Sequence, residues 1–309
     1  MKRVLVTGAT GCIGRHILPG LLATGWEVHG VSSRDRDQAA GPVRWYRADL
    51  LDASQTESLV ATVRPSHLLH LAWYIAPGKW AMAPDNLRWV RASLNLLQSF
   101  QAHGGTRVVT AGSGLEYDWH YGYCAEDRTP CQPHTIYGTC KHALQLLTTA
   151  HAASTGMTSA WARIFFLYGP YEHPARLVAS VVRSVLDGEP AKCSHGLQIR
   201  DYLFVQDVAD AMVALLESDV SGPINIASGQ AITLRDIVTR AGTLLGRPEL
   251  IQLGAIPAAA TDTPLVVADT ARALQLLPSW RPKVGLDEGL QRTIDWWRQR
   301  SVTAEAHLS

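Results

Sequence analysis

The chain has 309 residues and a net charge of +1 at neutral pH. This length is enough for one large domain with a smaller lobe. The chain lacks the basic runs that a nucleic-acid partner would need, so we expect no such partner. No apolar stretch reaches the length of a membrane span, and the first expected strand lies too near Met1 for a signal peptide, so we expect a cytoplasmic protein with no membrane partner. Five cysteines without C-x-x-C pairs and twelve histidines without H-E-x-x-H spacing indicate reduced thiols and no metal site.

A glycine-rich turn follows the first expected strand. The apolar residues 4–6 lead into T-G-A-T-G-C-I-G, which has the spacing G-x-x-G-x-x-G and precedes an amphipathic helix. In such a strand–turn–helix unit the three glycines permit a tight turn, close approach of a pyrophosphate, and close packing of the helix on the strand. The helix N-terminus adds positive partial charge. We therefore expect a dinucleotide to bind at Gly8, Thr10, Gly11, Cys12, Ile13 and Gly14.

The end of the second expected strand, residues 26–31, bears on the choice of dinucleotide. Ser33 and Arg34 come first after this strand, and Asp35 follows them. An arginine at this place accommodates the 2′-phosphate of NADP, whereas an acidic residue binds the ribose hydroxyl of NAD. The order of the residues favours NADP(H) over NAD(H), with Ser33 and Arg34 as cofactor ligands. Asp35 is left as a cap for Arg34 or an alternative ribose ligand.

Strands and helices alternate through the first half of the chain. Further strands are expected at residues 43–47, 67–72, 107–111 and 157–164, with helices at 85–102 and 135–154. This alternation predicts an α/β fold with a doubly wound parallel sheet of the Rossmann type. It becomes irregular after residue 164, so we expect a dinucleotide-binding domain over 1–165, to which 201–228 return. The remaining segments, 166–200 and 229–300, are expected to form a smaller C-terminal substrate lobe, followed by a flexible tail over 301–309.

Tyr137 and Lys141 are the strongest candidates for chemistry. They are four residues apart, so they share one face of a helix that Thr135 is placed to cap. A lysine ammonium one turn away favours the phenolate and is expected to lower the pKa of the tyrosine. Ser113 ends the strand at 107–111, where its hydroxyl can donate to the same substrate oxygen. Together the three side chains suit hydride transfer to or from a carbinol carbon.

These motifs together resemble the extended short-chain dehydrogenases/reductases, the group of nucleotide-sugar epimerases, dehydratases and 4-ketoreductases. The resemblance covers roughly the first 210 residues and implies that Asp49 contacts the adenine, that Ala72 lines the cofactor, that Tyr137 is the acid/base and that Lys141 holds the nicotinamide ribose. It also implies a homodimer through the helices at 85–102 and 135–154. The remaining cofactor ligands expected at the family's positions are Leu50, Leu71 and Trp73.

The chain departs from the family pattern around the expected substrate. Gly114 and Leu115 follow Ser113, where 4,6-dehydratases carry Asp-Glu, so dehydration is disfavoured. We therefore expect an NADP(H)-dependent oxidoreductase that reduces a nucleotide-linked 4-keto-6-deoxyhexose. The alternatives are an epimerase with tightly held NAD(P) and a non-catalytic dinucleotide-binding regulator. The residues expected to bind a nucleotide-diphosphate sugar are Tyr74, Lys79, Gly114, Arg176 and Arg200.

Overall fold

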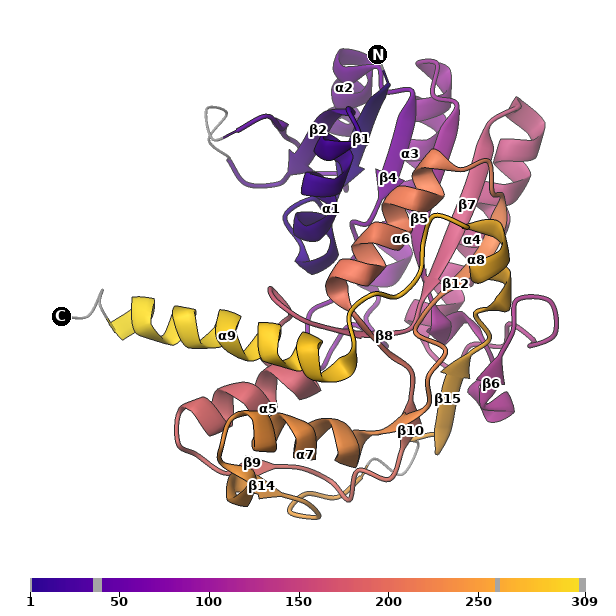
Figure 1. Ribbon diagram of the computed structural model, residues 1–309. Helices are drawn as coiled ribbons and strands as arrows, with labels where there is room; N and C mark the ends of the chain where they lie inside the picture. The colour runs from indigo at the N-terminus through magenta and orange to yellow at the C-terminus, as the bar shows by residue number, and fades with distance from the viewer. Residues whose placement is uncertain (1, 36–40, 259–261, 306–309) are drawn as a thin grey trace.

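The computed structural model describes residues 2–35, 41–258 and 262–305. A seven-stranded parallel sheet forms the core of its larger domain (Figure 1). The strands lie in the order β12-β7-β5-β4-β1-β2-β3. The chain switches direction across the sheet between β1 and β4, and a crevice at such a switch point is where doubly wound folds bind dinucleotides. The strands are β1 (Arg3–Thr7), β2 (Glu27–Ser32), β3 (Arg44–Arg47), β4 (His67–His70), β5 (Arg107–Ser113), β7 (Thr158–Ile164) and β12 (Gly222–Ile226).

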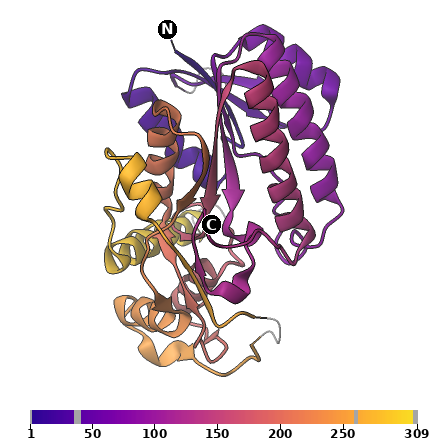
Figure 2. The same cartoon turned by 90° about the vertical axis from the view of Figure 1, so that its right-hand side faces the viewer.

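Helices cover both faces of this sheet, as the alternation of elements predicts, which confirms the expected fold class. On one face α1 (Cys12–Ala23) packs against α6 (Val205–Glu217). On the other face α2 (Ala53–Val63), α3 (Asp85–Ala102) and α4 (Ile136–Thr155) lie side by side (Figure 2). The strands between them are buried on both sides, which is why their sequences are nearly continuous apolar runs.

Local capping explains where several helices begin. The side chain of Thr135 accepts a hydrogen bond from the Gly138 amide, which confirms the expected N-cap of α4. Asp52 accepts from two amides in the first turn of α2. Thr233 likewise caps α7 (Leu234–Leu244). These caps satisfy amides that would otherwise lack partners at the helix ends.

The smaller lobe lies beneath the carboxyl ends of the main strands (Figure 1). Its core is formed by α5 (Leu177–Leu186), α7 and α9 (Leu286–Glu305), which pack on one another. Short turns η1 (Gly114–Glu116), η2 (Trp119–Tyr121) and η3 (Pro248–Leu250) connect the larger elements. Within the described residues, three small sheets complete the lobe. Two of them have two strands each, β8 (Phe166–Tyr168) with β11 (Tyr202–Phe204), and β9 (Ala191–Lys192) with β14 (Ile251–Gln252). The third has four strands in the order β13 (Ile232–Thr233), β10 (Ile199–Arg200), β15 (Leu265–Ala268) and β6 (Tyr123–Cys124).

The path of the chain differs in two places from the segments expected from the sequence. Helix α8 (Ala271–Leu276) falls in the segment 229–300 but packs on β12, and Ala273 and Trp280 enter the core of the main domain. Helix α9 continues to Glu305, past Ser301 where the tail was expected to start, and residues 306–309 lie outside the described residues. Across the described ranges, none of the helices combines the length and apolar character needed to cross a lipid bilayer.

Candidate active site

The glycine turn between β1 and α1 has the geometry of a phosphate cradle. Gly8 has a φ of 66°, and a Cβ there would lie 2.8 Å from the Ala72 amide nitrogen. Gly14 packs so closely on the carbonyl of Gly8 that a Cβ would collide with it. Gly11 is the N-cap of α1 and supplies no side-chain cap, so the first amides of the helix face the turn without a side-chain acceptor. This turn, which contains Thr10, Cys12 and Ile13, fits the pyrophosphate of a dinucleotide.

A buried hydrogen-bond chain fixes the end of β4 beside this cradle. The Thr7 hydroxyl oxygen accepts from the amides of Leu71 and Ala72, each at 3.1 Å, and lies 2.7 Å from His70 Nδ1. Burial, with a smaller contribution from the Lys141 charge, lowers the pKa of His70 to about 3. His70 is therefore neutral, and its Nε2 is 2.8 Å from the Ser93 hydroxyl. Leu71 and Ala72, both expected cofactor ligands, are thus held against Gly8.

The residues expected to hold the adenosine half lie at the tips of β2 and β3. Ser33 and Arg34 are exposed just beyond β2. The sequence left Asp35 as a possible cap for Arg34. In the structure its carboxylate instead accepts a hydrogen bond of 2.9 Å from Arg47, at the end of β3. Asp49 accepts from the Leu51 amide at 3.0 Å, and Leu50 is buried beneath it. Acidic side chains therefore line this end of the crevice.

Ser113 and Tyr137 meet where β5 ends and α4 begins. Ser113 is 8% exposed, and its hydroxyl oxygen accepts from the Leu115 amide at 3.2 Å. Gly138 allows this meeting, because a Cβ there would collide with the carbonyl of Leu115. Burial raises the pKa of Tyr137 to about 12, against the effect of a hydrogen bond with Ser113. The expectation that the Lys141 charge would lower this pKa is therefore wrong for this arrangement: burial dominates, and the groups that oppose it are Ser113 and Arg176.

Lys141 lies one turn further along α4, deep in the fold. Its Nζ donates to the carbonyl of Ala111 at 2.8 Å, and the side chain is 2% exposed. Burial lowers the pKa of Lys141 to about 7, while the Glu116 carboxylate opposes this shift. Nζ lies 3.8 Å from the ring centroid of Trp73 and 5.9 Å from that of Tyr137. A negative phenolate or ribose hydroxyls at this place would favour the charged form.

The loop between β4 and α3 brings two tryptophans to Tyr137 and Lys141. Trp73 packs on Lys141, and its Nε1 donates to the buried Asn86 at 2.8 Å. Trp80 meets the ring of Tyr137 edge-on, with centroids 4.8 Å apart. The sequence singled out Trp73 but missed Trp80, because the loop has no periodicity that would tell which ring turns inward. The two residues of this loop expected to contact the substrate are Tyr74, which is half-buried, and Lys79, which is exposed.

The two expected arginine ligands lie in different surroundings. Arg176 is the exposed N-cap residue of α5, lies 5.5 Å from the Trp80 ring, and acts electrostatically on Tyr137. Arg200 is buried and forms an ion pair with Asp262. A substrate diphosphate would have to compete with Asp262 for Arg200, whereas Arg176 lies against Trp80, which contacts Tyr137.

Glu172 is a further residue that the sequence did not single out. One of its carboxyl oxygens is buried with no hydrogen-bond partner among the described residues. Burial raises the pKa of Glu172 to about 8, and the charge of Arg176 opposes the shift. Burial, with a smaller contribution from the same carboxyl, raises the pKa of the Cys12 thiol on the glycine turn. Glu172 therefore borders the crevice between the cradle and the lobe.

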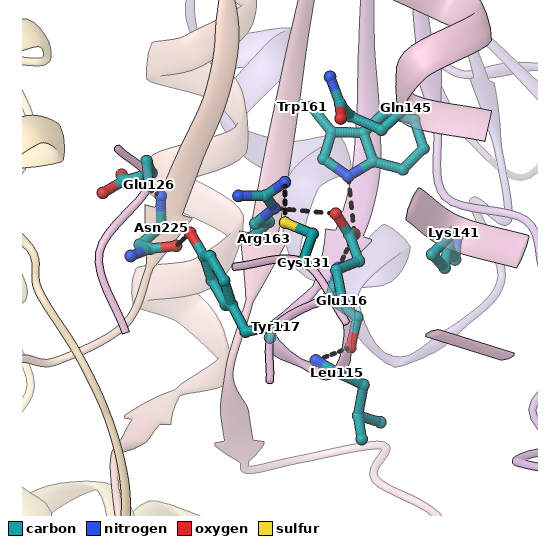
Figure 3. A network of polar contacts seen from close by, with 12 residues as sticks. Leu115, Glu116, Tyr117, Glu126, Cys131, Lys141, Gln145, Trp161, Arg163 and Asn225 are labelled. Atoms are coloured by element: carbon teal, nitrogen blue, oxygen red, sulfur yellow. Dashed lines mark hydrogen bonds and ion pairs between the residues drawn. The ribbon is translucent and has the colours of Figure 1, made fainter. Parts of the chain in front are cut away.

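A buried ion pair between Glu116 and Arg163 holds the backbone next to Ser113 (Figure 3). Glu116 Oε1 accepts from the Ser113 amide at 2.8 Å and from Trp161 Nε1 at 2.7 Å, and Oε2 accepts from Arg163 Nε at 2.8 Å. Arg163 Nη2 also lies 3.1 Å from the sulfur of Cys131. Ser113 and Glu116 form a capping box around Gly114, which holds the serine at the end of β5. The spacing S-x-x-E was a visible signal for this role.

Comparisons with known proteins identify the family of the chain. Residues 4–227 match the model of the NAD dependent epimerase/dehydratase family. The UDP-glucose 4-epimerase of Mycolicibacterium smegmatis is 28% identical over 97% of this chain and 99% of its own. A crystal structure of the Thermus thermophilus UDP-glucose 4-epimerase with NAD is 28% identical, covers 96% of this chain and 99% of its own, and has a TM-score of 0.81. MoeE5 in complex with UDP-glucuronic acid and NAD is 31% identical, with coverage of 96% and 99% and a TM-score of 0.84.

The cofactor in these structures corrects one expectation from the sequence. Both solved relatives contain NAD, so the preference for NADP(H) is wrong. The structure supplies a physical reason. The order of residues favoured the exposed Arg34 at the tip of β2, but the carboxylate of Asp35 lies at the same tip, fixed by Arg47. A carboxylate at this place suits ribose hydroxyls and repels a 2′-phosphate.

Proposed function

Because the chain belongs to the NAD dependent epimerase/dehydratase family, an extended short-chain dehydrogenase/reductase group, we propose that it inverts C4 of a nucleotide-linked hexose or hexuronate with NAD. The observation that carries this proposal is the meeting of Ser113, Tyr137 and Lys141 at the carboxyl end of β5, beside the glycine cradle. The residues directly after Ser113 are Gly114 and Leu115, so the acidic pair that 4,6-dehydratases carry there for loss of water is missing from these two positions. Removal and return of a hydride at one carbon needs no second acid.

Each side chain then has a defined task. Tyr137 accepts the proton of the sugar hydroxyl as the C4–H bond breaks, and returns it after the keto sugar has turned its other face. Ser113 donates a hydrogen bond to the same oxygen and holds it near the phenol. Lys141 binds ribose hydroxyls and adds positive charge next to Tyr137. Bound NAD supplies the hydride acceptor and, in its oxidised form, a positive charge that favours the phenolate.

The wider crevice supports a nucleotide-linked substrate. Arg176 presents a guanidinium on the lobe side of Tyr137, where it suits a diphosphate or a sugar carboxylate. Glu172 borders the same space with an unpartnered oxygen that suits a hydroxyl or amide donor. Tyr74 and Lys79 belong to the same loop as Trp80, which contacts both Tyr137 and Arg176, and both remain proposed substrate contacts.

The test is a substrate panel followed by NMR. Purified protein is incubated with UDP-glucose, UDP-galactose or UDP-glucuronic acid, each deuterated at C4, with NAD and no reductant. The proposal predicts the C4 epimer of at least one substrate, with deuterium kept at C4 because the same hydride returns.

Three other outcomes would contradict it. Consumption of reduced cofactor by a 4-keto sugar without epimerisation would make the protein a reductase. Release of carbon dioxide from UDP-glucuronic acid would make it a decarboxylase. Tight NAD binding with no conversion of nucleotide sugars would favour a non-catalytic regulator.

A further inference from the structure

Three metal-ligating side chains gather outside the proposed active site. Asp118, His120 and His134 each offer one ligand atom, and these atoms all lie within 4.8 Å of one another. His120 and His134 come from two segments, the η2 turn and the stretch just before α4. The cluster could not be found from the sequence, because D-x-H followed fourteen residues later by a single histidine matches no common metal motif. From this cluster we propose a binding site for a zinc-class divalent transition metal.

The distances within the cluster carry the proposal. Asp118 Oδ1 lies 2.8 Å from His120 Nδ1 and 3.5 Å from His134 Nε2. Metal–ligand bonds of about 2.0–2.2 Å in a tetrahedral zinc site place neighbouring ligand atoms roughly 3.3–3.5 Å apart. The contact with His134 is longer than an ordinary N–H···O hydrogen bond but equals this ligand-to-ligand spacing. A metal can therefore be accommodated with small rotations of the two exposed imidazoles, while Asp118 stays in place as the cap of η2.

Exposure and chemistry favour this class of ion. The side chains of His120 and His134 are 77% and 62% exposed, which leaves an ion open to water at a fourth position. Asp118 is 14% exposed and is anchored by its own amide, which donates to the carbonyl of Pro130 at 2.9 Å. Two imidazoles and one carboxylate suit zinc, cobalt, nickel or copper, whereas magnesium and calcium prefer oxygen ligands.

The proposed site joins the two segments that carry the proposed catalytic residues. Trp119, between two of the ligands, donates from Nε1 to the carbonyl of Gly114 at 2.7 Å, directly after Ser113. His134 immediately precedes Thr135, the N-cap of the helix that carries Tyr137. A bound ion would therefore cross-link the turn after β5 to the start of α4. Its role is to fix these segments, and the ligands do not touch the reacting atoms.

Direct metal binding tests the proposal without reference to catalysis. The full-length chain is freed of metal with a chelator, and its affinity for Zn²⁺ is measured by competition with a chromophoric chelator. The variants are His120→Gln and His134→Gln, with His195→Gln as the control, because His195 is an exposed histidine elsewhere in the lobe. Glutamine keeps an N–H that can donate to Asp118, so a cluster held only by hydrogen bonds would be largely preserved.

The proposal predicts one Zn²⁺ per wild-type chain and at least about 10-fold weaker binding in each cluster variant, since even the loss of outer-shell partners costs that much. The His195→Gln control should keep wild-type affinity. Co²⁺ should give the visible absorption of a tetrahedral nitrogen and oxygen site in the wild type and the control only. Zn²⁺ should raise the Tm of the same two proteins. Equal affinity in all four proteins, or no stoichiometric binding, would overturn the proposal and leave adventitious association only.

Discussion

The buried Glu116–Arg163 pair should contribute strongly to stability, and Arg163→Met tests this. Both side chains are at most 3% exposed, so the substitution leaves a carboxylate without its counter-charge. Breaking such a pair typically costs about 3–5 kcal/mol. Glu116 would keep its hydrogen bonds from Ser113 and Trp161. We therefore expect a loss near the lower end, about 3 kcal/mol in the free energy of unfolding.

A double-mutant cycle separates the charge from the packing. In Glu116→Gln/Arg163→Met, the amide oxygen can take the place of Oε1 and accept from Ser113 and Trp161, and no buried charge remains. The double variant should therefore be more stable than Arg163→Met by at least about 1 kcal/mol. Glu116→Gln alone should be strongly destabilised, because it leaves the Arg163 guanidinium buried and uncompensated.

Urea unfolding, followed by tryptophan fluorescence and circular dichroism together, measures all four proteins of this cycle. Trp161 lies within the network and is one of the ten tryptophans that contribute to the fluorescence. If the effects of the two single substitutions simply add within about 0.5 kcal/mol, the pair is not an energetic unit and the reasoning fails.

Three further predictions concern separate parts of the molecule. Gly14→Ala should lower the free energy of unfolding by about 1–3 kcal/mol, because the added methyl group overpacks against Gly8. It should also weaken NAD binding measured by calorimetry, and an unchanged affinity would argue against the phosphate cradle. Glu172 has a pKa of about 8 when folded against about 4.5 unfolded, so its contribution to stability is lost as pH rises through this window. Between pH 5 and pH 8 the wild type should therefore lose on the order of 1 kcal/mol or more of stability relative to Glu172→Gln in urea titrations; parallel pH profiles would contradict this. We propose a homodimer through α3 and α4, where Leu87 and Leu146 are exposed; Leu146→Lys should then give monomers by light scattering, and a wild-type monomer would exclude it.

Local patterns in the sequence predicted much of the fold and part of the candidate site. The glycine spacing places Gly8, Gly11 and Gly14 in one turn, because the whole unit spans a few residues. Tyr137 and Lys141 share a helix face for the same reason. The position of Ser113 at the carboxyl end of β5 was also predicted, because the serine follows a continuous apolar run.

Contacts between distant segments could not be predicted in this way. Asp262 pairs with Arg200 across the lobe, and Trp80 turns toward Tyr137 from an irregular loop. The pKa of Tyr137 was misjudged because the sequence shows its neighbouring charge but not its burial. The cofactor was misjudged because Arg34 and Asp35 are adjacent, and order along the chain does not tell which of them faces a ribose.

The proposed acid/base role of Tyr137 is tested most directly by Tyr137→Phe, with Tyr123→Phe, an exposed tyrosine on β6, as the matched control. NAD affinity and C4 epimerisation are measured on both proteins with whichever UDP-sugar of the panel is converted. We predict that Tyr137→Phe binds NAD like the wild type but loses about 10²–10⁴-fold in turnover, while the control keeps both. Epimerisation by Tyr137→Phe at the wild-type rate would contradict the account.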